Sequence, residues 1–235
     1  MSVAAIVPAA GRGERLGPGQ PKALRELGGV PMLVHAVRAL SRARLVDLVV
    51  VAAPADGVNE VKALLALHDI GAEVRVVAGG AERQESVALA LAALPAHVDT
   101  VLVHDAARPL APSELVDAVA SAVLSGHRAV VPGLPASDTV KRVRVGEGAI
   151  ESVTETLHRT ELRLIQTPQG FDRALLTQAH RAADELATDD AGLVERLGQP
   201  VVVVPGSMEA FKITRPIDLV LAEAVLSERR ANGAL

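Results

Sequence analysis

Cysteine is absent from the 235-residue sequence. Its absence excludes disulfide bonds, thiolate metal ligands and a cysteine nucleophile. A chain without cysteine suits a reducing compartment, and Met1–Val7 carries no basic segment of the kind that opens a signal peptide. We therefore expect a cytoplasmic protein.

Aromatic residues are nearly missing too, because the chain holds only Phe171 and Phe211 and has neither tryptophan nor tyrosine. A nucleobase therefore cannot be held between stacked aromatic rings, and backbone groups and small side chains would have to bind it. The apolar runs are all shorter than the roughly 18 residues that a membrane-spanning helix needs. We expect no membrane association.

Charge of either sign is not in large excess: 24 lysines and arginines face 28 acids, and the net charge is −4. A protein whose main partner is nucleic acid normally has a basic surface, so we expect no nucleic-acid partner. If the chain binds a polyanion, its basic residues must gather in one site. Hydrophobic residues make up 49% of the chain, as in an ordinary globular protein.

Segments typical of strands and helices alternate along the chain. Val3–Val7 is a continuous apolar run that ends at Pro8, as a buried parallel strand would. Further strands are predicted at Leu48–Ala52, Val74–Val77, Val101–Val103, Ala129–Val131, Leu164–Gln166 and Val201–Val204. Helices are predicted at Leu33–Ala43, Val58–Leu67, Glu82–Leu94, Ser113–Leu124, Arg173–Leu186 and Pro216–Arg230, with Ser113 and Thr214 as N-caps of their helices. Repeated βα units predict an α/β fold with a doubly wound, largely parallel sheet, in which ligands lie beyond the carboxyl ends of the strands.

Thr139–Thr154 breaks this alternation. Valines and Ile150 flank Gly146-Glu147-Gly148, which is typical of a β-hairpin with a glycine turn. A lone hairpin is marginally stable in water, so this one should pack on something. A second subunit is the simplest partner, and the alternative is a plain surface excursion.

The loop after the first strand, residues 8–22, is rich in glycine and small residues, which let backbone N–H groups approach phosphate oxygens. Arg15 and Lys22 add positive charge. A dinucleotide fingerprint would need a glycine where Leu16 stands, and no Gly-Lys-Ser/Thr run forms a P-loop. A loop suited to wrapping a triphosphate remains, with a simple charged connection as the alternative.

Two further loops lie at the same predicted edge. Gly79-Gly80 leads into a helix whose first turn carries Arg83 and Ser86, where free N–H groups can bind an anion. Asp105 follows the strand at Val101–Val103, and a single carboxylate there can hold Mg²⁺ while phosphates and water complete the shell. Helix capping and a turn-forming aspartate are the respective alternatives.

Three other polar positions have plainer interpretations. His104 is expected to be a packed or hydrogen-bonded structural histidine. Asp189-Asp190 could suggest acid–base chemistry, but a helix N-cap is the better interpretation. Lys212, predicted on a short strand before the last helix, is functional only if it faces the same cleft as Lys22.

Taken together, these loops form a set of motifs in a fixed order. They are Pro8-Ala9-Ala10-Gly11 with Arg15 and Pro21-Lys22; Gly79-Gly80 with Arg83 and Ser86; His104-Asp105-Ala106-Ala107-Arg108-Pro109; Asp138-Thr139; Thr167-Pro168-Gln169; Thr188-Asp189; and Lys212-Ile213-Thr214. The set resembles the 2-C-methyl-D-erythritol 4-phosphate cytidylyltransferase family of non-mevalonate isoprenoid precursor biosynthesis, from Val3 to about Glu223. The resemblance implies a Rossmann-like mixed sheet, a single nucleotidyltransferase domain over residues 1–235, and a homodimer formed through an arm at residues 138–158.

The resemblance also implies roles for individual residues. The catalytic residues would be Lys22, Lys212 and Arg15, and Asp105 would bind Mg²⁺ or another divalent cation. The residues around CTP would be Ala9, Ala10, Gly11, Gly13, Gly80, Arg83, Ser86 and Ala106. The residues around the polyol phosphate would be Arg108, Thr139, Arg159, Thr167 and Thr188, with Thr139 and Arg159 reaching in from the partner's arm.

The chemistry expected of such a site needs no general base. A phosphate monoester is mostly a dianion at neutral pH and can attack the α-phosphorus of CTP directly, so catalysis rests on positioning and cationic stabilisation. Alternatives are a cytidylyltransferase for another polyol phosphate such as ribitol 5-phosphate, a glycosyltransferase and a nucleotide-sensing module. The glycosyltransferase would carry Asp-x-Asp where Ala107 stands, and the sensor has no use for two lysines at one phosphate.

Overall fold

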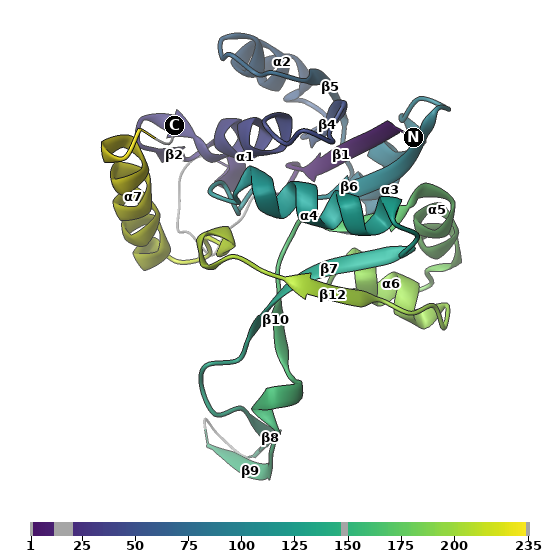
Figure 1. Ribbon diagram of the computed structural model, residues 1–235, viewed down its shortest axis with the longest axis vertical. Coiled ribbons are helices and arrows are strands. Elements are labelled where there is room, and N and C mark those ends of the chain that lie inside the picture. Colours follow the sequence, from purple (N-terminus) through teal and green to yellow (C-terminus); the bar gives the residue numbers. More distant parts are fainter. Residues whose placement is uncertain (1, 12–20, 147–149, 234–235) are drawn as a thin grey trace.

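The computed structural model describes residues 2–11, 21–146 and 150–233. One mixed eight-stranded sheet runs through the molecule in the order β10-β7-β11-β6-β1-β4-β5, with β12 paired to β7 (Figure 1). The strands are β1 (Ser2–Pro8), β4 (Leu48–Ala53), β5 (Glu73–Ala78), β6 (Val98–Val103), β7 (Ala129–Pro135), β10 (Arg163–Ile165), β11 (Gln169–Asp172) and β12 (Val202–Pro205). The pairs β1–β4, β1–β6, β4–β5 and β7–β12 are parallel.

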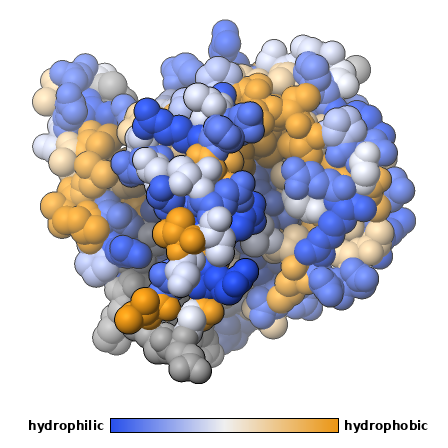
Figure 2. Space-filling model, turned by 90° about the horizontal axis from the view of Figure 1, so that it is seen from below, coloured by the Kyte–Doolittle hydropathy of each residue, from blue (hydrophilic) through white to orange (hydrophobic). Residues whose placement is uncertain are grey.

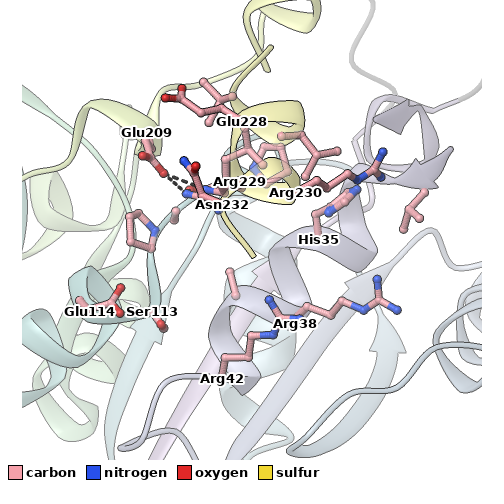
Figure 3. A pocket seen from close by; sticks show the side chains of 18 residues that line it. His35, Arg38, Arg42, Ser113, Glu114, Glu209, Glu228, Arg229, Arg230 and Asn232 are labelled. Carbon is pink, nitrogen blue, oxygen red and sulfur yellow. Dashed lines mark hydrogen bonds and ion pairs between the residues drawn. The ribbon is translucent and has the colours of Figure 1, made fainter. Parts of the chain in front are cut away.

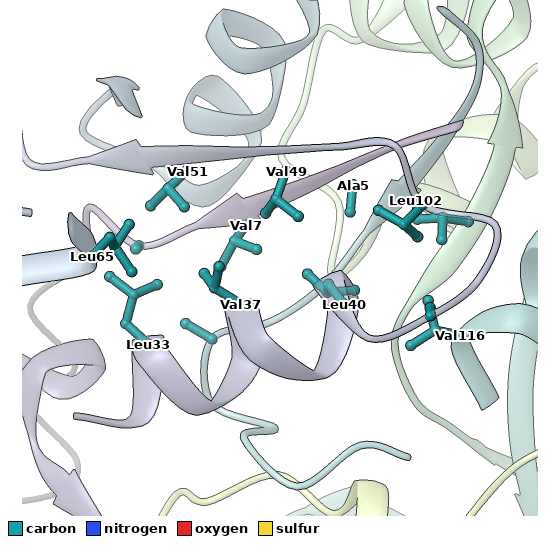
Figure 4. Packing of buried hydrophobic residues seen from close by; sticks show 14 of the residues in the cluster. Ala5, Val7, Leu33, Val37, Leu40, Val49, Val51, Leu65, Leu102 and Val116 are labelled. Atoms are coloured by element: carbon teal, nitrogen blue, oxygen red, sulfur yellow. The ribbon is translucent and has the colours of Figure 1, made fainter. Parts of the chain in front are cut away.

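Helices cover both faces of this sheet, because the central strands are apolar on both sides. On one face, Val3, Ala5 and Val7 of β1 pack with α1 (Met32–Ser41), α2 (Val58–Ala66) and α4 (Ser113–Leu124) (Figure 4). On the other face, Ala4 and Ile6 pack with α3 (Arg83–Ala92), α5 (Arg173–Ala182) and α6 (Asp190–Arg196). The alternation of side chains along one strand therefore builds two cores.

The predicted α/β doubly wound fold is confirmed, and the sheet differs from the prediction in one strand. β11 was not predicted; it lies between β6 and β7 and is antiparallel to both. It is short and includes Gly170, so its local sequence carries little strand signal, and pairing with two distant strands determines its conformation. β10 is also antiparallel to its neighbour β7. It begins and ends one residue earlier than the strand predicted at Leu164–Gln166.

Two of the predicted N-caps, Ser113 and Thr214, are wrong. Ser113 is the first residue of α4, whose N-cap position is Pro112, without a side-chain cap. The last helix, α7 (Pro216–Ala231), has Arg215 at its N-cap position. Thr214 instead donates from its N–H and hydroxyl to Oδ2 of Asp218, at 2.7 and 2.9 Å. Asp218 ties the residues before the helix to its first turn.

Two further expectations about local structure are wrong. α5 ends at Ala182 rather than at Leu186; the carbonyls of Glu185 and Leu186, beyond the helix, accept hydrogen bonds from Arg196 at 3.1 and 3.2 Å. Lys212 lies on an irregular segment, not on a strand.

The hairpin predicted in Thr139–Thr154 exists and projects from the body of the protein as an arm (Figure 1). Its strands β8 (Lys141–Val145) and β9 (Glu151–Thr156) pair with each other in a separate two-stranded sheet. Every residue of both strands is exposed, including Val145 with 78% of its surface. The arm therefore has no hydrophobic core of its own.

α7 closes one end of the molecule. Its Leu226 packs in a small core with Leu27, Leu110 and Ile213, close to the hairpin of β2 (Glu26–Leu27) and β3 (Val30–Pro31). Gly28 in that hairpin has a φ of +59°, and a Cβ there would meet Leu226 at 2.5 Å, so both conformation and space require glycine. No helix within residues 2–11, 21–146 and 150–233 is long and apolar enough to cross a bilayer.

Gly170 provides a test of the packing between β11 and α4. A Cβ at this position would lie 2.7 Å from Val119 and 2.8 Å from Val123. Gly170→Ala should therefore lower the free energy of unfolding by about 1–3 kcal/mol, the usual cost of overpacking a core. Urea denaturation measures this change. Gly71→Ala is the matched control, since a Cβ there meets nothing closer than 3.6 Å, and an equal loss in both variants would contradict the prediction.

Candidate active site

A pocket of about 210 Å³ lies at the carboxyl ends of β1 and β6, beside the first turn of α3. Its lining comes from five separate stretches of the chain: Pro8–Gly11, Lys22–Ala23, Arg83 with Ser86, Asp105–Ala107, and Lys212. The predicted convergence of Lys22 and Lys212 on one cleft is therefore confirmed. Two ammonium groups and one guanidinium line the same small volume.

Asp105 lies among these positively charged groups. Its Oδ1 is 3.1 Å from Nε of Arg83, and its Oδ2 is 2.8 Å from Nζ of Lys212. Burial alone would raise the pKa of Asp105, but the charges of Arg83 and Lys212 hold that pKa well below its usual value. Asp105 is therefore ionised at neutral pH and fixes both cations toward the pocket.

A buried network holds the backbone of Asp105. Its N–H donates to Oγ1 of Thr167 at 3.0 Å, and the Thr167 hydroxyl lies 3.0 Å from Nδ1 of His104. His104 is fully buried, and its Nε2 donates to the carbonyl of Arg108 at 3.1 Å. A carbonyl can only accept, so Nε2 carries the proton, and the Thr167 hydroxyl donates to Nδ1 while it accepts from Asp105. His104 is thus the hydrogen-bonded structural histidine that was expected.

Small residues keep the pocket open. A Cβ on Gly79 would lie 2.8 Å from Ala10 and 2.9 Å from Oγ of Ser86. The Gly80 N–H donates to the same Oγ at 3.1 Å, so Ser86 ties the glycine turn to α3. The wall from Ala9 to Gly11 is therefore made of backbone and methyl groups, as expected for a ligand that the backbone binds.

Arg83 connects the pocket to a second, more deeply buried acid, Asp190, which the sequence predicted only as part of a helix N-cap. Its Nη1 lies 2.7 Å from Oδ2 of Asp190, whose side chain is 1% exposed. Nε2 of His180 lies 2.9 Å from the other oxygen of Asp190. The expected helix cap is Asp189 alone, which accepts from Gly192 N at 2.9 Å.

Asp190 left one signal in the sequence. Asp190, Leu193 and Val194 are spaced as the apolar face of a helix, and all three are buried. A carboxylate on the buried face of a helix needs a partner. Burial would raise the pKa of Asp190, whereas the hydrogen bond from His180 and the charge of Arg83 hold it below its usual value.

Arg108 lies directly behind the pocket. Its Nη1 donates to the carbonyl of Ala210 at 2.7 Å and its Nη2 to that of Ile165 at 3.3 Å. The neighbouring loops are also joined by the Ile213 N–H and the Ala107 carbonyl, at 2.8 Å. The loop that carries Asp105 and the segment that carries Lys212 are thus bound together.

The charge of Arg108 is compensated only weakly. Its guanidinium is buried without an ion pair, and its Nε has no hydrogen-bond partner in the part of the chain that is described. Burial lowers its pKa. The nearby charge of Asp105 offsets this lowering in part, and a buried cation without a direct ion pair favours an anionic ligand.

The other predicted residues within the described part of the chain do not line the pocket. Thr139 and Thr188 are exposed, and Arg159 is exposed and donates to the carbonyl of Ser137 at 2.5 Å. Thr167 is buried in the His104 network, so its role toward substrate stays a prediction. Arg15 and Gly13 lie outside the described residues.

A larger pocket of about 600 Å³ lies between α1, α4 and α7 (Figure 3). Arg229 and Arg230, two of its four arginines, are engaged within the fold. Arg229 pairs with Glu209 and donates to the Leu110 carbonyl at 2.6 Å, and Arg230 donates to the Gly28 carbonyl at 3.1 Å. None of the predicted site residues that the structure describes lines it, so its size does not make it the functional site.

A strand-end pocket lined by small residues, two lysines and one carboxylate, on a doubly wound α/β sheet, is typical of nucleotidyltransferases. The profile of the 2-C-methyl-D-erythritol 4-phosphate cytidylyltransferase family (IspD) matches residues 3–228. The chain belongs to this family.

Named relatives agree with that assignment. The chain is 60% identical over 233 residues to the 2-C-methyl-D-erythritol 4-phosphate cytidylyltransferase of Streptomyces avermitilis, across 97% of this chain and 93% of the relative. It resembles the crystal structure of the Thermus thermophilus enzyme of the same name with a TM-score of 0.76 and 40% identity, over 97% of this chain and 100% of the other. The structure of 4-diphosphocytidyl-2C-methyl-D-erythritol synthase from Anaerococcus prevotii matches with a TM-score of 0.81 and 30% identity, over 96% of each chain.

His104 gives the protein a specific pH dependence. Burial lowers its pKa to about 4, from an ordinary 6.5. Between these values the unfolded chain binds a proton that the folded chain does not, so stability rises with pH through this window and is complete above it. We expect His104 to contribute about 3 kcal/mol of stability at pH 7 that is lost by pH 4.

Chemical denaturation at pH 4.5 to 7 measures this effect. The His104→Gln variant should show a shallower dependence of unfolding free energy on pH than the wild type. Exposed His97 provides the control variant, His97→Gln. Identical slopes for wild type and His104→Gln would contradict the assignment.

Proposed function

We propose that the strand-end pocket binds CTP and that the protein transfers CMP to 2-C-methyl-D-erythritol 4-phosphate, releasing pyrophosphate, as a step of isoprenoid precursor biosynthesis in the cytoplasm. The observation that carries this proposal is the convergence of Lys22, Lys212 and Arg83 on one pocket, in which Arg83 and Lys212 both contact the carboxylate of Asp105. Family membership gives the substrate class, and the pocket supplies the charge that the reaction requires.

The reaction brings two polyanions together. A phosphate oxygen of the acceptor attacks the α-phosphorus of CTP, a new P–O bond forms, and the bond to the bridging oxygen breaks as pyrophosphate leaves. Negative charge grows on that bridging oxygen. Lys22 and Lys212, with Arg15 from the same loop as Lys22, stabilise this charge and align the reactants. The acceptor phosphate is already a dianion, so no side chain has to remove a proton.

Asp105 is suited to hold Mg²⁺ together with the nucleotide. Among the described residues that line the pocket it is the one acid, and no cluster of three metal-binding side chains occurs in residues 2–11, 21–146 and 150–233. Mg²⁺ is commonly bound by one or two carboxylates, with phosphate oxygens and water as the other ligands. An ionised, partly accessible carboxylate beside a triphosphate pocket fits that pattern. When bound, Mg²⁺ would neutralise phosphate charge.

The arm of residues 138–158 is proposed to join two copies of the chain. Val145 and Ile150 are each 78% exposed, and Val153 is 60% exposed. The face of the molecule seen from the arm side has apolar side chains interleaved with polar ones (Figure 2). A second copy would cover these apolar residues and bring Thr139 of its arm, with Arg159 directly after the arm, to the polyol phosphate, where Arg108 offers a buried charge.

A pyrophosphate-release assay tests the proposed reaction. Purified protein with CTP and Mg²⁺ should release pyrophosphate with 2-C-methyl-D-erythritol 4-phosphate. Ribitol 5-phosphate and other polyol phosphates form the comparison panel, and ATP and UTP test the choice of base. Turnover of another polyol phosphate at a higher kcat/KM would overturn the assignment of the acceptor.

Lys22→Ala should lower kcat by about 10²–10³, the scale of losing one preorganised group that stabilises transition-state charge. Steady-state kinetics at saturating CTP measures the change. Lys62→Ala removes an exposed lysine on α2 and serves as the control. Near-normal turnover by Lys22→Ala would remove Lys22 from the catalytic residues.

Charged substitutions in the arm test the proposed dimer. Val145→Glu with Ile150→Glu should shift the protein toward monomer in sedimentation or light scattering, because each change places a carboxylate where an apolar contact is expected. Activity should fall with the loss of the dimer. Leu67→Glu alters an apolar residue that is 81% exposed on another part of the surface, as a control. A chain that is monomeric before mutation, yet fully active, would contradict the arm's role.

A further inference from the structure

Asp190 lies outside the pocket but makes a direct ion pair with Arg83, which lines it. Its side chain is 1% exposed, and it starts α6, an element that contributes no residue to the pocket lining. The contact partner, Arg83, is 107 residues earlier in the chain and does line the pocket. Such a deeply buried acid is costly unless it is paired and hydrogen-bonded.

The guanidinium of Arg83 is shared between two acids. Nη1 bonds to Asp190 at 2.7 Å, and Nε bonds to Asp105 at 3.1 Å. A guanidinium is a planar, rigid group, so contacts at two of its nitrogens fix the orientation of its plane. Of the two acids, Asp190 makes the shorter contact with Arg83, and its carboxylate is more deeply buried than that of Asp105. It therefore anchors Arg83, while Asp105 remains shared between Arg83 and Lys212.

We propose that Asp190 is a positioning residue of the nucleotide pocket, which acts by holding Arg83 in the orientation that CTP binding requires. The inference rests on the proposed function, because it takes the pocket to be the CTP site. Without Asp190, Arg83 would have Asp105 as its one carboxylate partner and would turn toward it. Arg83 would then no longer be held in the orientation that CTP binding requires.

His180 supports this role from the other side. It lies on α5 with a side chain that is 4% exposed, and its Nε2 bonds to Asp190 at 2.9 Å. Its second nitrogen, Nδ1, is buried and has no hydrogen-bond partner among the described residues. An unsatisfied buried nitrogen is unfavourable. The fold tolerates it at a position where the other ring nitrogen fixes Asp190, which indicates that the placement of Asp190 matters.

Equilibrium binding of CTP, measured by calorimetry on the full chain, provides the first readout. Asp190→Asn keeps the size of the side chain and removes its charge. We expect it to weaken CTP binding and raise KM for CTP about tenfold, within the range of couplings found in salt-bridge networks, with kcat changed less than twofold. Asp190→Glu, which restores the charge, should recover part of the affinity.

A double-mutant cycle tests whether Asp190 acts through Arg83. In an Arg83→Ala background, Asp190→Asn should have no further effect on CTP affinity. An unchanged affinity in the single variant Asp190→Asn, or an undiminished effect of the substitution without Arg83, would overturn the inference. If Asp190→Asn does not fold, His180→Leu replaces it, since it removes one of the two partners of Asp190; a smaller loss of CTP affinity is then expected, and no loss overturns the inference.

Asp117→Asn is the matched control. Asp117 is also a buried acid, bonded to Nε of Arg44 at 3.2 Å and to the N–H of Leu45 at 3.1 Å, but it does not line the pocket. It should change stability without changing CTP affinity. Pyrophosphate release by the wild type is measured separately, so a wild type that binds CTP but does not turn over removes the proposed function and leaves the positioning role standing.

Discussion

The pocket depends on the compensation of one buried negative charge. Removing a carboxylate from water costs several kcal/mol even in a real protein, and Asp105 is stable in its ionised form only because Arg83 and Lys212 both contact it. The same contacts hold Arg83 and Lys212 close together when no anionic ligand is bound. Asp105 thus resolves a physical problem of any polyphosphate site, which is to keep several positive groups near one another before the ligand arrives.

The rest of the site supports this arrangement from three directions. The His104–Thr167 pair holds the backbone of Asp105, and Asp190 holds the far side of Arg83. The Ala210 carbonyl accepts from Arg108, and the Ile213 N–H donates to the Ala107 carbonyl; together these bonds fix the neighbourhood of Lys212. A positioned charge contributes to catalysis because it needs no reorganisation during the reaction. These supporting contacts around the pocket therefore explain how a site with no general base can still be catalytic.

The sequence predicted the parts of the fold and site that local patterns encode. The continuous apolar run of β1 identified a strand buried on both faces, and the glycine and cationic loops at strand ends identified the pocket before the structure did. β11 and the pairing of Asp190 with Arg83 were not predictable in this way. Each arises from contacts between segments far apart in the chain, and a four-residue strand with a glycine or an acid at a helix start is locally ordinary.

Lys212 illustrates the same limit more sharply. Its residue type suggested nothing beyond a surface group, its predicted strand does not exist, and its position follows from the hydrogen bond between Ile213 and Ala107. Only a tertiary contact turns it into a pocket residue. Resemblance to a family identified it, whereas periodicity and spacing could not.

The joining of the loops around Ala107 and Ile213 also determines when the site can exist during synthesis. The ribosome makes the chain from its N-terminus, and domains fold once their parts have emerged. Asp105 and Arg83 are made in the first half of the chain, whereas Asp190 and Lys212 come near the end. Until the last helix has docked, the nascent protein holds an acid and an arginine without their later partners. The nucleotide pocket is thus one of the last features of this molecule to mature.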